Sequence, residues 1–258
     1  MKSSPDYQRR FGGIERLYGA GALARAAAAH VVVVGIGGVG SWAVEALARS
    51  GLGRLTLVDL DHVAESNVNR QIHALESTFG AAKVAAMKDR IAAINPDCAV
   101  IAVEEFIDEA NVAALIPACD AVIDAIDQVP AKAALIAHCR RAGIRIVTTG
   151  GAGGRIDPTR VEVIDLSCTI HDALASKLRA RLRKDYGFTR DPKKKFGVDC
   201  VFSAEQIRRP AGADSCDGNG DFDAAAGLAC AGYGSSVAVT ASFGFAAAAR
   251  ALAGILAA

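Results

Sequence analysis

Four glycines occur within six residues, at Gly35, Gly37, Gly38 and Gly40, directly after a run of four valines. Glycines between a strand and a helix let a phosphate approach the backbone, and the N–H groups at the helix start attract its negative charge. Asp59 comes nineteen residues after Gly40, where a carboxylate at the end of the next strand binds ribose hydroxyls. The pattern predicts a nucleotide site; glycines that serve only helix–strand packing are the alternative.

Polar residues that follow Asp59 indicate which nucleotide is bound. The segment DLDHVAESNVNRQ and its continuation supply groups able to contact a nucleotide: Asp61, Asn67, Arg70, Gln71 and Lys83. Nucleotidyl transfer needs cations that neutralise charge on the phosphates, whereas a dinucleotide oxidoreductase has no such need at this place. Each cation alone has a simpler interpretation, a surface ion pair for Arg70 and a solvated helix face for Lys83. Together they predict ATP rather than NAD.

A change from apolar to acidic residues marks the end of a later strand, in the run VIDAID at 122–127. The carboxyl edge of a parallel sheet is a suitable place for a carboxylate that holds Mg²⁺ against nucleotide phosphates. Asp127 is therefore the predicted Mg²⁺ ligand and a predicted catalytic residue. Its alternative role is an N-cap of the helix expected after Pro130, since aspartate is a common cap.

Segments of strand and helix type alternate around these groups over more than 100 residues. The expected strands are 31–34, 55–58, 99–103, 121–123 and 144–147, and the expected helices are 40–49, 81–94, 111–115 and 133–141. Such alternation predicts an α/β fold with a Rossmann-like, doubly wound, mostly parallel sheet. Ligands bind such sheets beyond the carboxyl ends of the strands, where the glycine loop, Asp59 and Asp127 all fall.

The pattern changes after Thr148. A glycine-rich turn is followed by an expected strand at 161–165, a basic helix after His171, and an irregular crossover stretch over 186–234. No repeat and no clear boundary divides the chain. We therefore predict a single domain over 1–258, with a nucleotide-binding core at 28–150 and a substrate-side extension at 151–258.

The composition is typical of a folded cytoplasmic protein. Hydrophobic residues make up 52% of the 258 and charged residues 22%, and the net charge of +1 gives no global attraction to DNA or to a membrane surface. The seven cysteines never form C-x-x-C, which suits a reducing compartment without structural zinc. The first residues contain no apolar segment of the secretory type.

One apolar segment, 224–249, contains no charged residue and is long enough to cross a bilayer. It consists mostly of alanine, glycine and serine, whose transfer into lipid contributes little free energy. A buried helix over about 236–256 is therefore expected. Membrane association through this segment is the alternative.

Taken as a set, GIGGVG, LVDLD, NVNRQ, Lys83 and DAID resemble the adenylation core of the ubiquitin-activating-enzyme superfamily, the ThiF-type domain. Members of this superfamily activate a carboxylate as an acyl-adenylate. The resemblance implies that Asp59 binds the ribose and that Asn67, Arg70 and Lys83 contact phosphates. It also implies that Asp127 holds the Mg²⁺ ion needed for adenylation.

Longer runs are similar to the tRNA threonylcarbamoyladenosine dehydratases over nearly the whole chain: RFGGIERLYG, GIGGVGSWAVEALARSG, NRQIHAL, AINPDC, TTGGAGGRIDPT, GVDCVFS and FGF. The similarity implies an enzyme that uses ATP to cyclise a threonylcarbamoyl group on the adenosine next to a tRNA anticodon. The threonyl carboxylate would take AMP, and the carbamoyl group would then displace it. An activator of a ubiquitin-like sulfur-carrier protein is the alternative, although the zinc-bearing members of that group carry the C-x-x-C pairs that this chain lacks.

The resemblance also concerns assembly and cysteines. The superfamily works as a homodimer whose N-terminal arginine crosses into the neighbouring site, a role for Arg16 or Arg10 here. A sulfur-relay protein partner, and a monovalent cation at the glycine-rich turn after Thr149, are left open. Cys200 and Cys230 lie where related enzymes carry a thioester or persulfide cysteine, but buried, inert thiols are expected at both positions.

A local excess of basic residues gives independent support for a tRNA partner. Two acids, Asp185 and Asp191, lie among nine cations: Lys177, Arg179, Arg181, Arg183, Lys184, Arg190, Lys193, Lys194 and Lys195. Such a basic cluster would attract an RNA backbone, with binding that weakens as salt rises. The alternative is an amphipathic helix with a solvated basic side, because Leu174, Leu178 and Leu182 form an apolar stripe.

Overall fold

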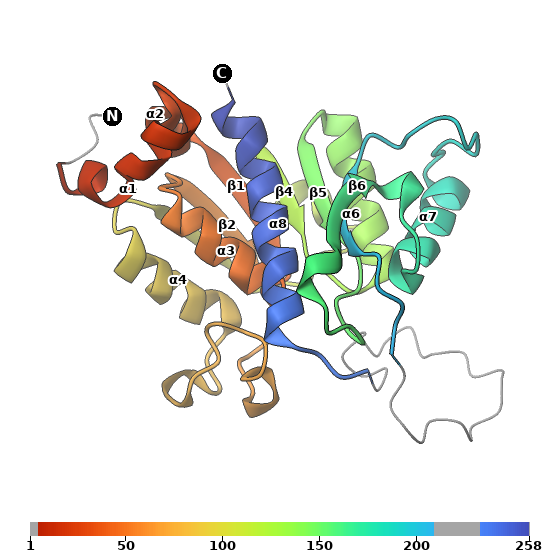
Figure 1. Ribbon diagram of the computed structural model, residues 1–258, viewed down its shortest axis with the longest axis horizontal. Helices are drawn as coiled ribbons and strands as arrows, with labels where there is room; N and C mark the ends of the chain where they lie inside the picture. Colours follow the sequence, from red (N-terminus) through yellow and green to blue (C-terminus); the bar gives the residue numbers. More distant parts are fainter. Residues whose placement is uncertain (1–4, 209–232, 258) are drawn as a thin grey trace.

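A seven-stranded sheet forms the centre of the protein in the computed structural model, which describes residues 5–208 and 233–257 (Figure 1). The strand order is β3-β2-β1-β4-β5-β7-β6, and every pair is parallel except β6 with β7. The strands are β1 (His30–Val34), β2 (Arg54–Val58), β3 (Ala99–Val103), β4 (Ala121–Asp124), β5 (Arg145–Thr149), β6 (Val161–Asp165) and β7 (Asp199–Ser203).

Helices cover both faces of the sheet, because the central strand β1 is apolar on both sides. Val31 and Val33 pack into a core with α3, α4 and α8, whereas Val32 and Val34 pack into a second core with α5, α6 and α7. The helices are α1 (Pro5–Tyr18), α2 (Ala22–Ala28), α3 (Gly40–Arg49), α4 (Lys83–Ile94), α5 (Val112–Leu115), α6 (Val129–Ala142), α7 (Ala173–Asp185) and α8 (Val237–Leu256). The predicted Rossmann-like, doubly wound fold is confirmed.

One part of the sequence prediction is wrong. The stretch 186–234 was expected to be irregular, yet it contains β7, which lies between β5 and β6. β7 pairs parallel to β5 through Val147 and Asp199, and antiparallel to β6 through Ile164 and Cys200. Its five residues, DCVFS, are too few to show a periodicity, so only the tertiary pairing defines this strand. Residues 209–232 of that stretch lie outside the described part of the chain.

Helix α8 lies beside α3 on one face of the sheet (Figure 1). A Cβ on Gly244 would lie 2.5 Å from the Val39 carbonyl oxygen, so the close approach of the two helices requires glycine there. The expected buried helix over 236–256 is confirmed. Although α8 is long and apolar enough to cross a membrane, 56% of its most apolar window is buried inside the protein, as for a core helix.

Two N-terminal helices, which were not among the expected elements, cover the amino edge of the sheet. The Tyr7 hydroxyl donates a hydrogen bond to the carbonyl oxygen of Gly51, just before β2, and Phe11 and Leu23 pack beside Tyr7. In Figure 1 these helices are at the upper left, whereas the orange segment between β2 and α4 lies at the bottom. Helix α1 and the loops after the strands are therefore at opposite edges of the sheet.

Candidate active site

The glycine loop joins β1 to α3 beside β4, where the order of the strands reverses. Gly35 has φ +86°, and a Cβ there would lie 2.8 Å from the Ala125 carbonyl oxygen. A Cβ on Gly40 would lie only 1.8 Å from the Gly35 carbonyl oxygen, whereas Gly37 has open space around it. Gly35 and Gly40 therefore close the turn, and Gly37 leaves room for a ligand. Ligands of doubly wound sheets bind at such a reversal.

The Asp59 carboxylate, at the end of β2, is bonded to this loop. Its Oδ2 atom accepts the Ile36 N–H at 2.5 Å and its Oδ1 atom accepts the Asp61 N–H at 2.8 Å. Burial raises the pKa of Asp59 above its usual value, and the positive charge of Lys83 acts against that rise. The structure thus places the predicted ribose ligand directly at the glycine loop.

Lys83 is the first residue of α4, and its side chain is only 7% exposed. Its Nζ atom donates a hydrogen bond to Asp61 Oδ2 at 2.6 Å, while the Asp61 side chain is 55% exposed. The interpretation of Lys83 as a solvated helix residue is therefore wrong. The ammonium group is held beside the Asp59 carboxylate, in a position suited to a phosphate contact.

Arg70 lies over the glycine loop. A Cβ on Gly38 would lie 3.1 Å from Arg70 Cγ, and Trp42 of α3 donates its indole N–H to the Arg70 carbonyl oxygen at 2.9 Å. The Arg70 guanidinium donates to the Ser66 carbonyl oxygen at 2.7 Å and to Asn69 Oδ1 at 2.9 Å. It forms no ion pair with any described residue, so the surface ion-pair interpretation is wrong.

Asn67 and Gln71 flank Arg70 in the same turn and are both buried. The Asn67 Oδ1 atom accepts the Ala64 N–H at 3.1 Å, so this side chain holds the turn that carries Arg70. The Gln71 Oε1 atom is buried without a hydrogen-bond partner among the described residues. A polar atom buried in this way lacks a compensating contact, which a ligand or a water could supply.

A wholly buried ion pair supports the loop after β4. Lys132 of α6 lies 3.0 Å from Asp124 Oδ2, and both side chains are 0% exposed. The same carboxylate accepts the Thr148 hydroxyl at 2.6 Å and the Ile126 N–H at 3.2 Å. The pair thus fixes the loop that leads to Asp127. This pair was not predicted, because its only local signal is an acid at the end of an otherwise apolar strand.

Asp127 is exposed at the carboxyl edge of the sheet, three residues after β4. Gln128, not Asp127, is the N-cap of α6, so the capping interpretation of Asp127 is wrong. The described residues hold no group of three or more His, Cys, Asp or Glu side chains suited to a metal. Mg²⁺ is often bound by one or two carboxylates together with substrate phosphates, which a single exposed carboxylate next to a phosphate loop fits.

The structure does not bring the predicted N-terminal arginine to this site. Helix α1 packs at Gly51 on the opposite edge of the sheet. Arg10 donates to Asp6 Oδ2 at 2.7 Å and to the Ile94 carbonyl oxygen at 3.0 Å, so it is already engaged within its own chain. Arg16 is exposed, and its side chain makes no hydrogen bond or ion pair with a described residue. Of the two arginines, Arg16 is the one available to another molecule.

The glycine-rich turn after β5 is bonded to the start of α7. Asp172 caps that helix through the Ala175 N–H at 2.8 Å and accepts the Gly151 N–H at 3.0 Å. A Cβ on Gly150 would lie 2.0 Å from Asp172 Oδ2. The buried Arg155 pairs with Asp172 at 3.5 Å. The basic helix therefore begins at the sheet edge that carries Asp127, a connection that the sequence did not predict.

The basic cluster lies on α7 and the segment after it. The leucines of its apolar stripe are buried against the second core, as the amphipathic interpretation requires. Arg181 pairs with Asp185, and the Arg183 guanidinium lies 5.2 Å from the Phe196 ring centroid. Most of the other cations are exposed: Lys177, Lys184, Arg190, Lys193, Lys194 and Lys195. The helix is therefore amphipathic and also presents a basic surface.

Cys200 is a buried residue of β7, exposed by only 1%. Burial raises the pKa of its thiol far above the usual value, which disfavours the reactive thiolate. The structure therefore agrees with the expectation of an inert thiol at Cys200. Cys230 lies outside the described residues.

Comparisons with known proteins cover nearly the whole chain. Residues 7–255 match the ThiF family. The chain is 52% identical over 252 residues to the tRNA threonylcarbamoyladenosine dehydratase of Escherichia coli (strain K12), covering 96% of this chain and 94% of that protein. It is 47% identical to the enzyme of the same name from Haemophilus influenzae, covering 97% and 94%. The crystal structure of E. coli tRNA N6-threonylcarbamoyladenosine dehydratase in complex with ATP aligns with a TM-score of 0.88 at 50% identity, over 98% of this chain and 96% of that chain.

His73, two residues after Gln71, should make folding stability depend on pH. Its ring is 2% exposed with both nitrogens unpartnered among the described residues, and burial, followed by the charges of Lys83 and Arg90, lowers its pKa to about 4. Because the pKa is lowered, the unfolded chain binds the proton first as pH falls below about 6.5. This effect should remove roughly 2 kcal/mol of stability between pH 8 and pH 5.

Urea unfolding of the wild type and of His73→Leu at pH 8 and pH 5 checks this prediction. The difference between the two proteins at pH 8 reports the effects of the substitution that do not depend on titration of His73. The variant should lose less stability than the wild type on going to pH 5, and equal losses would contradict the assignment of this effect to His73.

Removal of Lys132 should destabilise the protein strongly. Lys132→Met leaves the Asp124 charge buried without its partner, which should lower the free energy of unfolding by about 3–5 kcal/mol. The double variant with Asp124→Asn should recover part of the loss, because the unpaired charge is gone. Lys88→Met, at an exposed position of α4, is the matched control and should stay near the wild type in urea unfolding.

Proposed function

This chain belongs to the ThiF family and, within it, to the tRNA threonylcarbamoyladenosine dehydratases, and we propose that it uses ATP to cyclise the threonylcarbamoyl group of N6-threonylcarbamoyladenosine in tRNA. The observation that carries this proposal is the convergence of four groups on the glycine loop at the reversal of strand order. These groups are Asp59, the Lys83–Asp61 pair, Arg70 and the loop that bears Asp127. The relatives that match nearly end to end carry the tRNA dehydratase name.

The first chemical step would be adenylation. The threonyl carboxylate attacks the α-phosphorus of ATP, the bond to the leaving oxygen breaks, and pyrophosphate departs. Arg70 and Lys83 would neutralise charge that develops on the phosphates, and Asp59 would hold the ribose. A bound Mg²⁺ ion would supply further neutralisation, with Asp127 as its protein ligand.

The second step would close the ring. The carbamoyl group attacks the activated carbonyl carbon and loses a proton, and AMP leaves with the carboxylate oxygen. The oxygen lost by the substrate therefore departs with AMP, so the net change is loss of one water at the expense of ATP. No covalent bond to the enzyme is needed, which agrees with the buried position of Cys200.

The surface charge and helix α8 bear on the RNA partner and on the cellular compartment. The exposed cations of the basic cluster would attract the tRNA backbone, and the protein would act in the cytoplasm with α8 as a core helix. A monovalent cation near Thr149 would need backbone carbonyl ligands, since the Asp172 carboxylate is already paired with Arg155. Both a sulfur-relay partner and activation of a sulfur-carrier protein stay predictions from the resemblance, and no described contact favours either.

Replacement of Asp127 tests the catalytic proposal. Asp127→Ala should lower turnover of modified tRNA at least about 100-fold, because stabilisation of charge in the transition state is lost. Its folding stability should change little, because the side chain is exposed. AMP formation and loss of one water from the tRNA nucleoside, measured by mass spectrometry, give the rate. Asp89→Ala, an exposed acid on α4, is the control; full activity of Asp127→Ala would reject the proposed role.

A mixed dimer tests whether Arg16 acts in the neighbouring site. Homodimers of Arg16→Ala and of Asp127→Ala should both be nearly inactive. In a dimer with one subunit of each kind, one of the two sites receives an intact Asp127 and an intact Arg16, so activity should return to about half of the wild type. Co-expression with two affinity tags isolates the mixed species. An inactive mixed dimer, or an active Arg16→Ala homodimer, would contradict the crossing role.

A further inference from the structure

One arginine of the basic cluster differs from the others in its surroundings. Arg179 of α7 is half-buried. Its guanidinium donates to the Thr169 hydroxyl and to the Leu166 carbonyl oxygen, in the segment that precedes the helix. Both acceptors are neutral, and Arg179 forms no ion pair with a described residue. Arg181, in contrast, is exposed and pairs with Asp185. The structure therefore fixes the position of the Arg179 charge without a direct ion pair, and the Asp172 carboxylate acts on it only at longer range.

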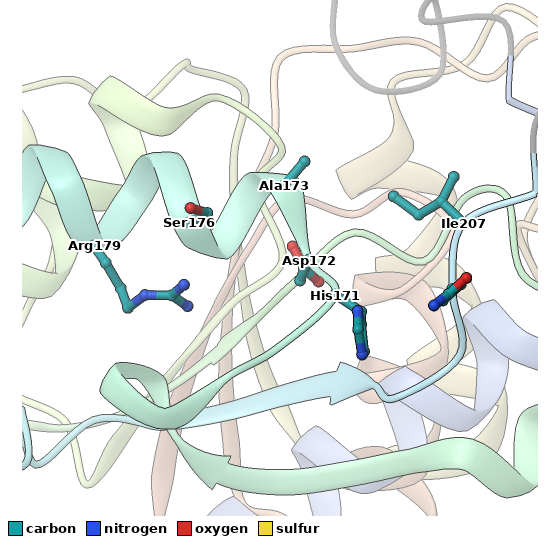
Figure 2. A pocket seen from close by; sticks show the side chains of 7 residues that line it. His171, Asp172, Ala173, Ser176, Arg179 and Ile207 are labelled. Carbon is teal, nitrogen blue, oxygen red and sulfur yellow. The ribbon is translucent and has the colours of Figure 1, made fainter.

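This charge lies at a hollow of about 390 Å³ between α7 and the end of β7. Figure 2 shows Arg179 extending toward the loop that carries His171, with Ile207 on the far side. The hollow is lined by His171, Asp172, Ala173, Ser176, Arg179, Gln206 and Ile207. Its one acid, Asp172, already binds Gly151, Ala175 and Arg155. The polar groups left for a ligand are the Arg179 guanidinium, the Ser176 hydroxyl, the His171 imidazole and the Gln206 amide, and they lie among apolar side chains such as Ala173 and Ile207.

The backbone at His171 is strained. Its φ is +52°, and it is the only non-glycine residue with positive φ in the described part of the chain. Arg155 holds this conformation by donating to the His171 carbonyl oxygen at 3.0 Å. The imidazole remains exposed at the rim of the hollow. Strain that persists in this way often marks a residue held for a ligand.

The hollow lies along the same sheet edge as the nucleotide site. The glycine loop follows β1, Asp127 follows β4, the glycine-rich turn follows β5, and Gln206 follows β7, in the spatial order of the strands. With strands about 4.8 Å apart, β7 is roughly 14 Å from β1. A substrate nucleotide whose threonylcarbamoyl group reaches the α-phosphate of ATP at the glycine loop would therefore extend along this edge toward the hollow.

We propose that this hollow binds a backbone phosphate of the RNA beside the reacting nucleotide. Arg179 supplies the charge, and Ser176 and His171 supply hydrogen bonds. The planar guanidinium suits a phosphate, and such contacts fix the register of a nucleic acid without reading its bases. Arg179 is thus a positioning residue, distinct from the exposed cations that attract RNA at longer range. This inference rests on the proposed function.

A cycle of protein and RNA changes tests the contact. The enzyme is assayed with an anticodon-arm RNA that carries N6-threonylcarbamoyladenosine. This RNA has either natural phosphates throughout or a neutral methylphosphonate in place of the phosphate on one side of the reacting nucleotide. Arg179→Ala should lower kcat/KM for the natural RNA roughly 10- to 100-fold, as expected for loss of a charge-assisted hydrogen bond. The neutral replacement of the contacted phosphate should lower the kcat/KM of the wild type by a similar factor. The same replacement should lower the kcat/KM of Arg179→Ala almost no further.

Controls separate this contact from folding and from net charge. Arg54→Ala removes an exposed cation at the amino edge of the sheet and should behave as the wild type with both RNAs. Arg179→Lys should recover part of the rate, and Ser176→Ala should lose a few-fold. These two variants keep the test decisive if Arg179→Ala folds poorly, as judged by circular dichroism and ATP binding.

The outcomes are distinguishable. If the falls in kcat/KM caused by the protein change and by the RNA change multiply independently at both flanking phosphates, Arg179 contacts neither phosphate. This result would overturn the inference and leave the proposed function standing. Equal rates for Arg179→Ala and Arg54→Ala would do the same. A wild-type protein that binds ATP but releases no AMP with the modified RNA would instead overturn the proposed function.

Discussion

A lysine and an aspartate whose side chains have no solvent-exposed surface lie between α6 and β4, at the place where the sheet reverses its order. Two buried charges are tolerated only when they are paired and fully hydrogen-bonded, and Asp124 meets this condition through Lys132, Thr148 and the backbone of Ile126. The loop fixed in this way touches Gly35, so the phosphate turn and the proposed metal carboxylate share one support. The geometry of the candidate site depends on this pair.

The local sequence was enough to predict the glycine loop, the position of Asp59 beside it and most of the fold. The valine run, the glycine spacing and Asp59 can each be interpreted from residues that are close in the sequence. The structure brings them together. Strand β7, Arg155 and Lys132 were not predicted, because each is defined by partners far away in sequence. No periodicity of the local residues reveals a long-range partner. The likeness to the dehydratases was recognised from motifs and is confirmed by the family match.

The carboxyl edge of the sheet separates charges by burial. Lys83 is buried beside two carboxylates near the glycine loop, whereas the cations of α7 are mostly exposed and have few acidic partners. Buried charges feel a lower dielectric and are little screened by salt, while exposed charges are screened within about a Debye length. The same edge thus offers short-range, salt-resistant contacts at one end and longer-range, salt-sensitive attraction at the other.

Helix α8 has a consequence for how the chain reaches its native state. Its residues complete the core that also contains Val31, Val33 and the apolar side of α3, although nearly the whole domain separates these segments in sequence. Contacts of such high sequence separation slow the search for the native topology. Until they form, the inner side of α3 stays accessible to other chains. Docking of α8 thus covers the inner side of α3 and packs against Val39 beside the phosphate turn, and a chain in which α8 is not docked leaves this apolar surface open to aggregation.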